Sequence, residues 1–178
     1  MSHTARVSDL HNRPEAAANY ATLRQLVDVV ERIDDETFVR ADTAFTDSSI
    51  GKHVRHILDF YRCFFLGLEA AHVDYDDRTR DTAIETRRAS AIDAASRAGE
   101  RLLTLDPAVD RELLVSSMTD VGVPATPCRS SIARELVFLQ SHAIHHLAMA
   151  VLMMNRFGFP TEPEWGLAPS TQDYLARD

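Results

Sequence analysis

The fold is decided by the stretch SSIARELVFLQSHAIHHLAMAVLMMNRF, residues 130–157. It is predicted to be one helix of about 42 Å, since each residue of an α-helix rises 1.5 Å. Ser130 or Ser131 can cap its start, and Gly158 and Pro160 supply its end. Apolar residues lie on nearly every side of this helix, which predicts that neighbouring elements bury it from several directions.

Three histidines lie in the middle of this apolar helix. His142 and His146 are four residues apart, so they lie on one face, one turn apart, and can direct two ring nitrogens at one ion. His145 borders the same face. Hydrogen bonding within a core is the alternative, because a buried imidazole needs a polar partner. The spacing of the pair favours a metal. Ala143 stands where HExxH metalloproteases carry their general base, so the pair indicates a ligand set without that reaction.

A second helix is predicted from Ser48 to Ala71, capped by Asp47 or Ser48. His53 and His56 fall on its apolar face, together with large aromatic residues. With the three histidines of residues 130–157, this is a surplus of imidazoles on inward faces, and it strengthens the metal interpretation. The spacing alone does not separate His53 from His56 as the ligand.

Two further helices are predicted, over Glu15–Ile33 and Asp81–Leu105, from apolar residues at helical spacing. Residues 111–128 contain valines, prolines and a glycine, which predict a short hairpin or an irregular loop over one end of the molecule. A last short helix is expected over Gln172–Arg177, capped by Ser170 or Thr171. The expected fold class is all-α, with four long helices forming a four-helix bundle.

Length and composition predict one domain over residues 1–178, with residues 1–13 as an irregular lead-in and 158–178 as a C-terminal cap segment. The net charge of −8 argues against nonspecific nucleic-acid binding, which needs clustered cations. The longest fully apolar run, residues 147–154, is too short to span a bilayer, and the start resembles no signal peptide. Two cysteines without CxxC spacing are typical of free thiols in a reducing compartment. We therefore expect a cytoplasmic protein with no nucleic-acid or membrane partner.

A histidine of the second helix, added to His142 and His146, would close a three-nitrogen site. Three protein ligands leave an open position, as in catalytic zinc sites, where bound water can reach a pKa of about 7. The same position could activate a thiol as its thiolate. Imidazole ligands suit zinc, nickel, iron and copper alike. A carboxylate-bridged di-iron site is excluded, because it needs two Glu-x-x-His motifs and only Glu69–His72 matches.

The chain resembles the DinB-like (DinB/YfiT) family of bacterial metal-dependent proteins. The resemblance rests on SSIGKHVRHILDFY (48–61) and SSIARELVFLQSHAIHHLA (130–148), while YDDRTRD (75–81) and GLAPSTQDY (166–174) resemble one branch of that family. It implies an up-down-down-up bundle and a divalent metal, zinc or nickel before iron. The implied ligands are His56, His142 and His146, with His145 as a neighbouring group. Characterised relatives imply a thiol-dependent transferase or hydrolase with a low-molecular-weight thiol as cosubstrate.

The resemblance also implies that residues 75–81 and 165–171, including Trp165, wall the metal pocket. Arg78 and Arg80 could then bind an anionic substrate or a cosubstrate carboxylate. The alternative, which the abundance of neighbouring aspartates favours, is that both arginines pair with those acids and only order the loop. Asp59 and Glu135 are candidates for a general base by position alone, and both are expected to be surface or helix-end charges.

The function expected from these features is Lewis-acid catalysis at an open three-histidine site, acting on a small-molecule substrate. The alternative is a non-catalytic bundle that dimerises through apolar helix faces, for which Met149, Met153 and Met154 would supply adaptable contacts. A homodimer is compatible with both interpretations. No catalytic residue beyond the metal ligands is identified, and Cys63 and Cys128 are expected to be a core residue and a loop thiol.

Overall fold

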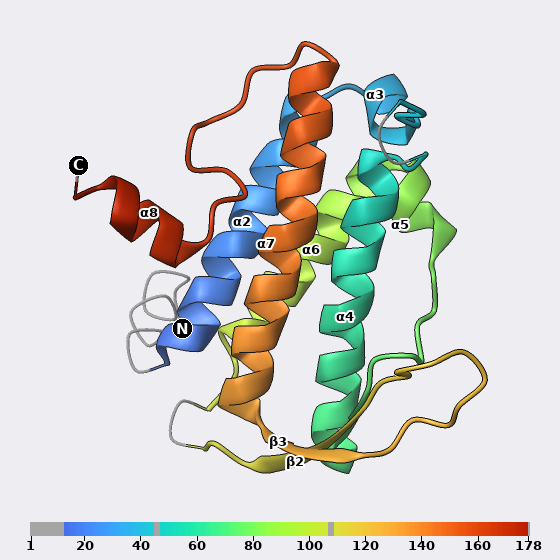
Figure 1. Ribbon diagram of the computed structural model, residues 1–178, viewed down its shortest axis with the longest axis vertical. Coiled ribbons are helices and arrows are strands. Elements are labelled where there is room, and N and C mark those ends of the chain that lie inside the picture. Colours follow the sequence, from blue (N-terminus) through green and yellow to red (C-terminus); the bar gives the residue numbers. More distant parts are fainter. Residues whose placement is uncertain (1–12, 45–46, 107–108, 178) are drawn as a thin grey trace.

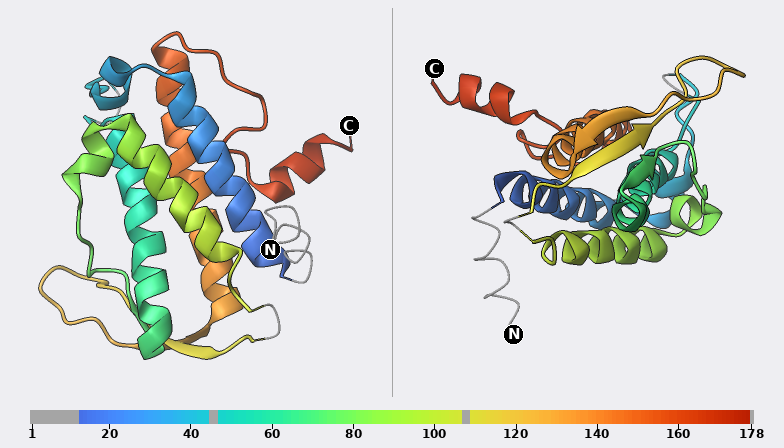
Figure 2. Two further views of the ribbon diagram at one scale, coloured as in Figure 1. Left: turned by 180° about the vertical axis from the view of Figure 1, so that it is seen from behind. Right: turned by 90° about the horizontal axis from the view of Figure 1, so that it is seen from below.

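The computed structural model describes residues 13–44, 47–106 and 109–177, so the expected lead-in lies outside the described residues except for Arg13. Four long helices lie side by side (Figure 1): α2 (Pro14–Arg32), α4 (Ile50–Ala70), α6 (Arg88–Leu102) and α7 (Ile132–Arg156). α2 and α7 run in one direction, and α4 and α6 run in the other (Figures 1 and 2). α6 and α7 each pack against both α2 and α4. The chain is therefore mainly helical, as predicted.

α7 begins as predicted, but it covers Ile132–Arg156 and is therefore shorter than the helix predicted over residues 130–157. Ser131 is its N-cap, and its side chain accepts a hydrogen bond from the backbone N–H of Arg134. For α4 the expected caps are wrong, because Ser49 occupies that position and accepts from Lys52 N–H. Asp47 instead has a left-handed backbone conformation, and Ser48 pairs through its carbonyl with Asp42 N–H.

The predicted helix over Asp81–Leu105 is broken into α5 (Thr82–Thr86) and α6, with Arg87 extended between them. The break has a tertiary cause. α5 lies against the first turn of α4, where a Cβ on Gly51 would come within 2.1 Å of the Glu85 carbonyl oxygen. α6 packs instead on α2, and Arg88 donates to the carbonyl oxygen of Val30. One straight helix could not make both contacts.

A small sheet lies at one end of the helices, with strands β1 (His72–Asp74), β2 (Glu112–Ser116) and β3 (Cys128–Ser131) in that order. β2 and β3 are antiparallel, which agrees with the hairpin expected before the last long helix. β1 pairs with β2 in parallel, with His72 opposite Leu114 and Asp74 opposite Ser116. Val73 is fully buried, because Gly67 lets β1 approach α4 closely.

After α7 the chain passes back along the side of α2 and α7 that faces away from α4, and ends in α8 (Pro169–Leu175) (Figure 1). α8 starts earlier than predicted, with Pro169 in its first turn and no side-chain cap. Trp165 is buried, the Arg32 guanidinium lies 4.5 Å from its ring centroid, and the backbone of Gly166 touches Ala148. A short helix, α3 (Asp35–Val39), capped by Asp34, links α2 to the segment before α4.

In the part of the chain that the structure describes, α7 has the length and mean hydropathy of a membrane-spanning helix. The central helix of a bundle has the same properties. α7 packs along both α2 and α4, and Leu136, Leu139, Leu147, Met153 and Met154 are fully buried there. Met153 and Met154 therefore belong to the core of this chain.

Candidate metal centre

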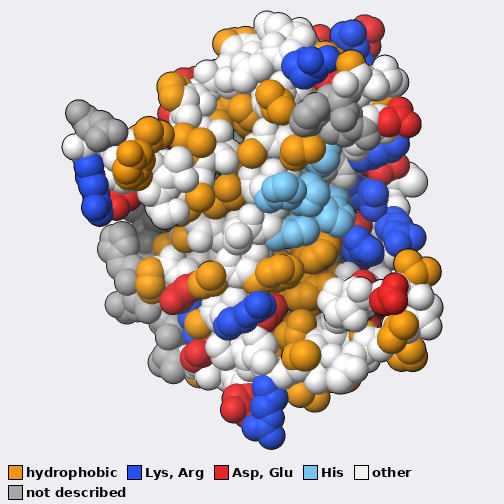
Figure 3. All heavy atoms as spheres, in the orientation of Figure 1, with side chains coloured by type: hydrophobic (Ala, Val, Ile, Leu, Met, Phe, Trp, Pro, Cys, Tyr) orange, Lys and Arg blue, Asp and Glu red, His pale blue; other side chains and the backbone are white. Residues whose placement is uncertain are grey.

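The junction of α4 and α7 brings three of the predicted ligands together: His56, His142 and His146. One nitrogen of each ring lies within 4.8 Å of a nitrogen of the other two. The centroid of the His56 ring lies 5.0 Å from that of His142 and 4.4 Å from that of His146. All three side chains are half-buried, and Figure 3 shows histidine side chains gathered at one place on the surface. We call these three residues the histidine triad.

The local reason for this arrangement is the packing of two helices with complementary faces. On α7, Ala143 and Leu147 are buried beside the histidines, and on α4 Ile57 is buried beside His56. These residues hold the two helices together on the core side. The imidazoles lie at the edge of the contact, where the site remains open to solvent on the face in Figure 3. An accessible triad of this kind leaves room for a further ligand.

His53 joins the triad at its edge, because its Nδ1 lies 3.0 Å from Nδ1 of His146. One of the two rings therefore donates a proton to the other, depending on the tautomer. His145 is exposed, and its ring centroid lies 5.2 Å from that of His146. The structure thus places four imidazoles in contact, with His145 beside them on the exposed side of α7.

Burial keeps these histidines neutral. It lowers the pKa of His56 and of His142 to about 4, and that of His146 to about 3. Repulsion from neighbouring histidines adds to the effect for all three, and the Arg78 guanidinium adds to it for His56 and His142. The pKa of His53 is also lowered by burial. Neutral imidazole is the form that binds a metal, so each triad member has a lone pair available at neutral pH.

Two buried ring nitrogens without a hydrogen-bond partner are also consistent with a metal site. The Nε2 atoms of His53 and His142 are buried and have no hydrogen-bond partner in the structure. Such atoms are costly unless something pairs with them. A divalent ion at the triad would pair with a nitrogen of His142, and the donor set of three imidazoles suits zinc, nickel, iron or copper.

Aromatic rings form the wall next to the triad. The Phe60 ring stacks on His142 at 4.0 Å between centroids and on Tyr75 at 5.0 Å. Phe138 lies 5.2 Å from Tyr75 and is half-buried. Hydrophobic side chains accordingly border the histidines in Figure 3. This wall restrains the His142 ring and excludes water from one side of the triad.

Asp59 of α4 and Glu135 of α7, which were expected to be surface or helix-end charges, are both buried. Asp59 is 3% exposed and bonds Arg55 at 3.0 Å. Glu135 is fully buried: it accepts from the Tyr75 hydroxyl at 2.8 Å and from Arg134 at 2.9 Å, and Ser130 also donates to it. Both oxygens of Glu135 are therefore occupied by donors. Neither acid belongs to the triad.

The expected walls of the pocket are correct only in part. Within residues 75–81, Tyr75 stacks on Phe60 next to the triad and Arg78 reaches His56. The segment after α7 does not: its contacts are with α2 and with Ala148, on the opposite side of α7 from the triad. Position in the sequence gave no signal for this difference, because only the path of the chain after Arg156 decides it.

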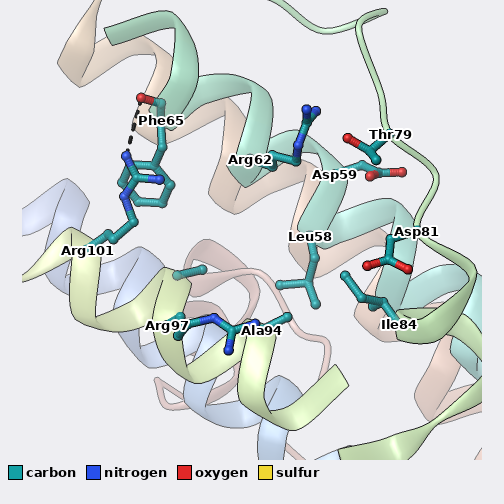
Figure 4. A pocket seen from close by; sticks show the side chains of 11 residues that line it. Leu58, Asp59, Arg62, Phe65, Thr79, Asp81, Ile84, Ala94, Arg97 and Arg101 are labelled. Carbon is teal, nitrogen blue, oxygen red and sulfur yellow. Dashed lines mark hydrogen bonds between the residues drawn. The ribbon is translucent and has the colours of Figure 1, made fainter. Parts of the chain in front are cut away.

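A separate cavity of about 360 Å³ lies on the other side of α4, between α4 and α6 (Figure 4). Leu58 and Phe65 contribute its apolar surface from α4, and Arg62, Arg97 and Arg101 contribute cations. Thr79 and Asp81 border it, whereas Arg78 of the same segment reaches the triad. The segment 78–81 thus contributes residues both to this cavity and to the surroundings of the triad.

Neither cysteine is a nucleophile in this arrangement. Cys63 is buried, its thiol donates to the Asp77 carbonyl oxygen at 3.3 Å, and burial raises its pKa to about 11. A thiol with so high a pKa carries almost no thiolate at neutral pH. Cys128 is exposed in β3, away from the triad. Any thiol at the triad would therefore come from outside the chain.

Comparison with known proteins identifies the superfamily of this chain. A curated protein named FK506-binding protein 5, from Rhizopus delemar, is 24% identical over 166 residues, which cover 87% of this chain and 36% of that protein. The chain thus spans about a third of the length of this relative. No solved structure matches. The family model described as the DinB superfamily matches residues 18–150, which include all three triad histidines, and the chain belongs to that superfamily.

Proposed function

We propose that this protein is a metal-dependent enzyme of the DinB type, with the four long helices as its up-down-down-up bundle. The histidine triad would hold a divalent ion, zinc or nickel before iron. The observation that carries the proposal is the convergence of three neutral imidazoles within 4.8 Å on a solvent-accessible face. Membership of the DinB superfamily supports it.

The ion would act as a Lewis acid toward whatever occupies its open position. The chain's own residues would prepare that position. If His146 donates its Nδ1 proton to His53, its Nε2 lone pair is free for the metal. Stacking of Phe60 on His142 holds that ring in place. These contacts hold the ligands before a metal arrives, which reduces the ordering cost of binding.

For the reaction we propose group transfer to, or hydrolysis assisted by, a low-molecular-weight thiol, on a small-molecule substrate in a reducing cytoplasm. Two observations support it. The open side of the triad is accessible, and the chain's own thiols are remote from it or protonated. A non-catalytic homodimer is the second candidate, and the exposed Val137 and Leu152 of α7 favour it.

The first test is elemental analysis of protein purified without a histidine tag, together with His56→Ala and His142→Ala. His72→Ala is the matched control, because His72 bonds Ser116 at 2.8 Å outside the triad. We expect near-stoichiometric metal in wild type and control, and loss of metal in both triad variants. Protein that is metal-free and cannot be reloaded would contradict the proposal and favour the non-catalytic dimer.

Thermal melting gives an independent measurement. A metal that binds only the native state at 100 times its dissociation constant stabilises by about 2.7 kcal/mol. For a domain of this size that is a rise in Tm of about 5–11 °C. Chelator-treated wild type should regain this shift when metal is added, and His142→Ala should not. An equal shift in both proteins would show that the metal binds elsewhere.

A further inference from the structure

The guanidinium of Arg78 is a cation beside the triad that lacks an acidic partner. Its Nη1 lies 3.4 Å from Nδ1 of His56, and its carbon lies 5.8 Å from the Phe60 ring centroid. Its Nε is buried and has no hydrogen-bond partner. Among the ion pairs of the described residues none involves Arg78, although four aspartates lie between positions 74 and 81. The expectation that it pairs with these acids is wrong.

The hydrogen bond of this guanidinium to His56 competes with a metal. A neutral imidazole has a single lone pair, and Arg78 is directed at one nitrogen of His56. If the metal takes the lone pair of His56, the other nitrogen carries a proton and can no longer accept from Arg78. The metal-loaded site would therefore leave the Arg78 side chain without an acceptor on that side.

The charge balance of the loaded site points the same way. The three ligands are neutral, so a dication at the triad would keep its full charge next to the cationic Arg78. Asp59 is already paired with Arg55 and does not compensate this charge. A dication held by three neutral ligands beside the Arg78 guanidinium, which has no acidic partner among the described residues, favours an anionic ligand.

We propose that Arg78 is the anion-recognising residue of the triad site and that its ligand carries a carboxylate. A guanidinium presents a planar pair of N–H donors that matches a carboxylate, and a carboxylate oxygen is also an acceptable ligand for a divalent metal. One carboxylate can therefore contact both cations. The inference rests on the proposed function, because it assumes a metal at the triad, and it defines the substrate or cosubstrate class of that site.

The test uses wild-type protein loaded with Co²⁺, with metal content measured first. Acetate is titrated at constant ionic strength set with perchlorate, and binding is followed by the visible absorption of the bound Co²⁺. Acetamide is the neutral comparison and inorganic phosphate the alternative oxyanion. Arg78→Gln removes the positive charge, and Arg78→Lys keeps the charge but lacks the planar pair of N–H donors. Arg87→Gln is the control for loss of a charge, because Arg87 is exposed between α5 and α6.

We expect acetate to bind wild type and Arg87→Gln equally, and Arg78→Gln about 10- to 100-fold more weakly, as for loss of a charge-assisted hydrogen bond. Acetamide should bind wild type more weakly than acetate. Equal acetate affinity in Arg78→Gln and wild type, or tighter binding of phosphate than acetate, would overturn the inference while the metal site stands. Failure to load Co²⁺ would instead overturn the proposed function itself, and the inference with it.

Discussion

The low pKa values of the triad predict that metal affinity hardly changes when the pH falls from 7 to 5. Three histidines with an ordinary pKa of about 6.5 would all compete with protons in this range and lose about 10⁴-fold in affinity. With pKa values of about 4, about 4 and about 3, the triad stays neutral. The loss should then be at most about tenfold.

The assay is competition for Zn²⁺ against a chromophoric chelator, calibrated at pH 7, 6 and 5. A flexible peptide with three histidines supplies the reference for ordinary titration. Far-UV circular dichroism at each pH shows whether the apoprotein is folded. A loss of about 10⁴-fold in the protein, parallel to that of the peptide, would refute the reasoning, because it would mean that the histidines titrate as exposed groups.

The same pKa values link the stability of the apoprotein to pH. Each histidine has a lower pKa in the folded than in the unfolded chain, so protons bind the unfolded chain more readily. The contribution of the neutral triad is fully present above about pH 6.5 and is lost as the pH falls toward the folded values near 3–4. Urea unfolding of apoprotein at pH 7 and pH 5 should show this decrease. Equal free energies of unfolding at both pH values would contradict it.

Two further substitutions test how residues 72–78 are held beside the site. Tyr75→Phe removes the hydroxyl that donates to buried Glu135, so we expect the free energy of unfolding to fall by about 1.5–3 kcal/mol. The Tm should fall by about 3–12 °C. The exposed control Tyr174→Phe should leave both values unchanged. Gly67→Ala places a Cβ 2.6 Å from the backbone of β1 and should lower the free energy of unfolding by about 1–3 kcal/mol. Gly99→Ala meets only the Tyr20 side chain and should stay within about 1 kcal/mol of wild type; equal effects of the two glycine substitutions would contradict the close packing of β1 on α4.

The long helices could be predicted from the local pattern of apolar residues. The residues at which they begin and end could be predicted less well. The apolar spacing of residues 15–33 and the continuous apolar stretch of α7 specify helices, because helix formation depends on neighbours three and four residues apart. The break at Arg87 and the strand at residues 72–74 could not be predicted this way. Both depend on contacts with residues distant in sequence: Gly51 and Val30 for α5 and α6, and β2 for β1.

The buried acids show the same limit. Glu135 follows the helix start by a few residues, a position at which an exposed acid is favourable. Its burial depends on Tyr75, sixty residues away, whose hydroxyl reaches it across the end of the sheet. Asp59 is buried because Arg55 pairs with both it and Glu85 of α5. The partner of Glu135 lies outside any local window, whereas Arg55 lies one turn from Asp59 and only its contact with Glu85 is distant in sequence.

The sequence by itself determined that His142 and His146 share a face, because four residues are one helical turn. It also limited the third ligand to the second helix, where His53 and His56 are three residues apart and share a face. The roles of His53 and His56 follow from tertiary packing, because the contact of α4 with α7 brings His56 into the triad and puts His53 against His146. Tertiary packing also directs the Arg78 side chain toward His56 and away from the neighbouring aspartates. Periodicity along one helix carries no information about the rotation of its partner, and that rotation is what positions the site.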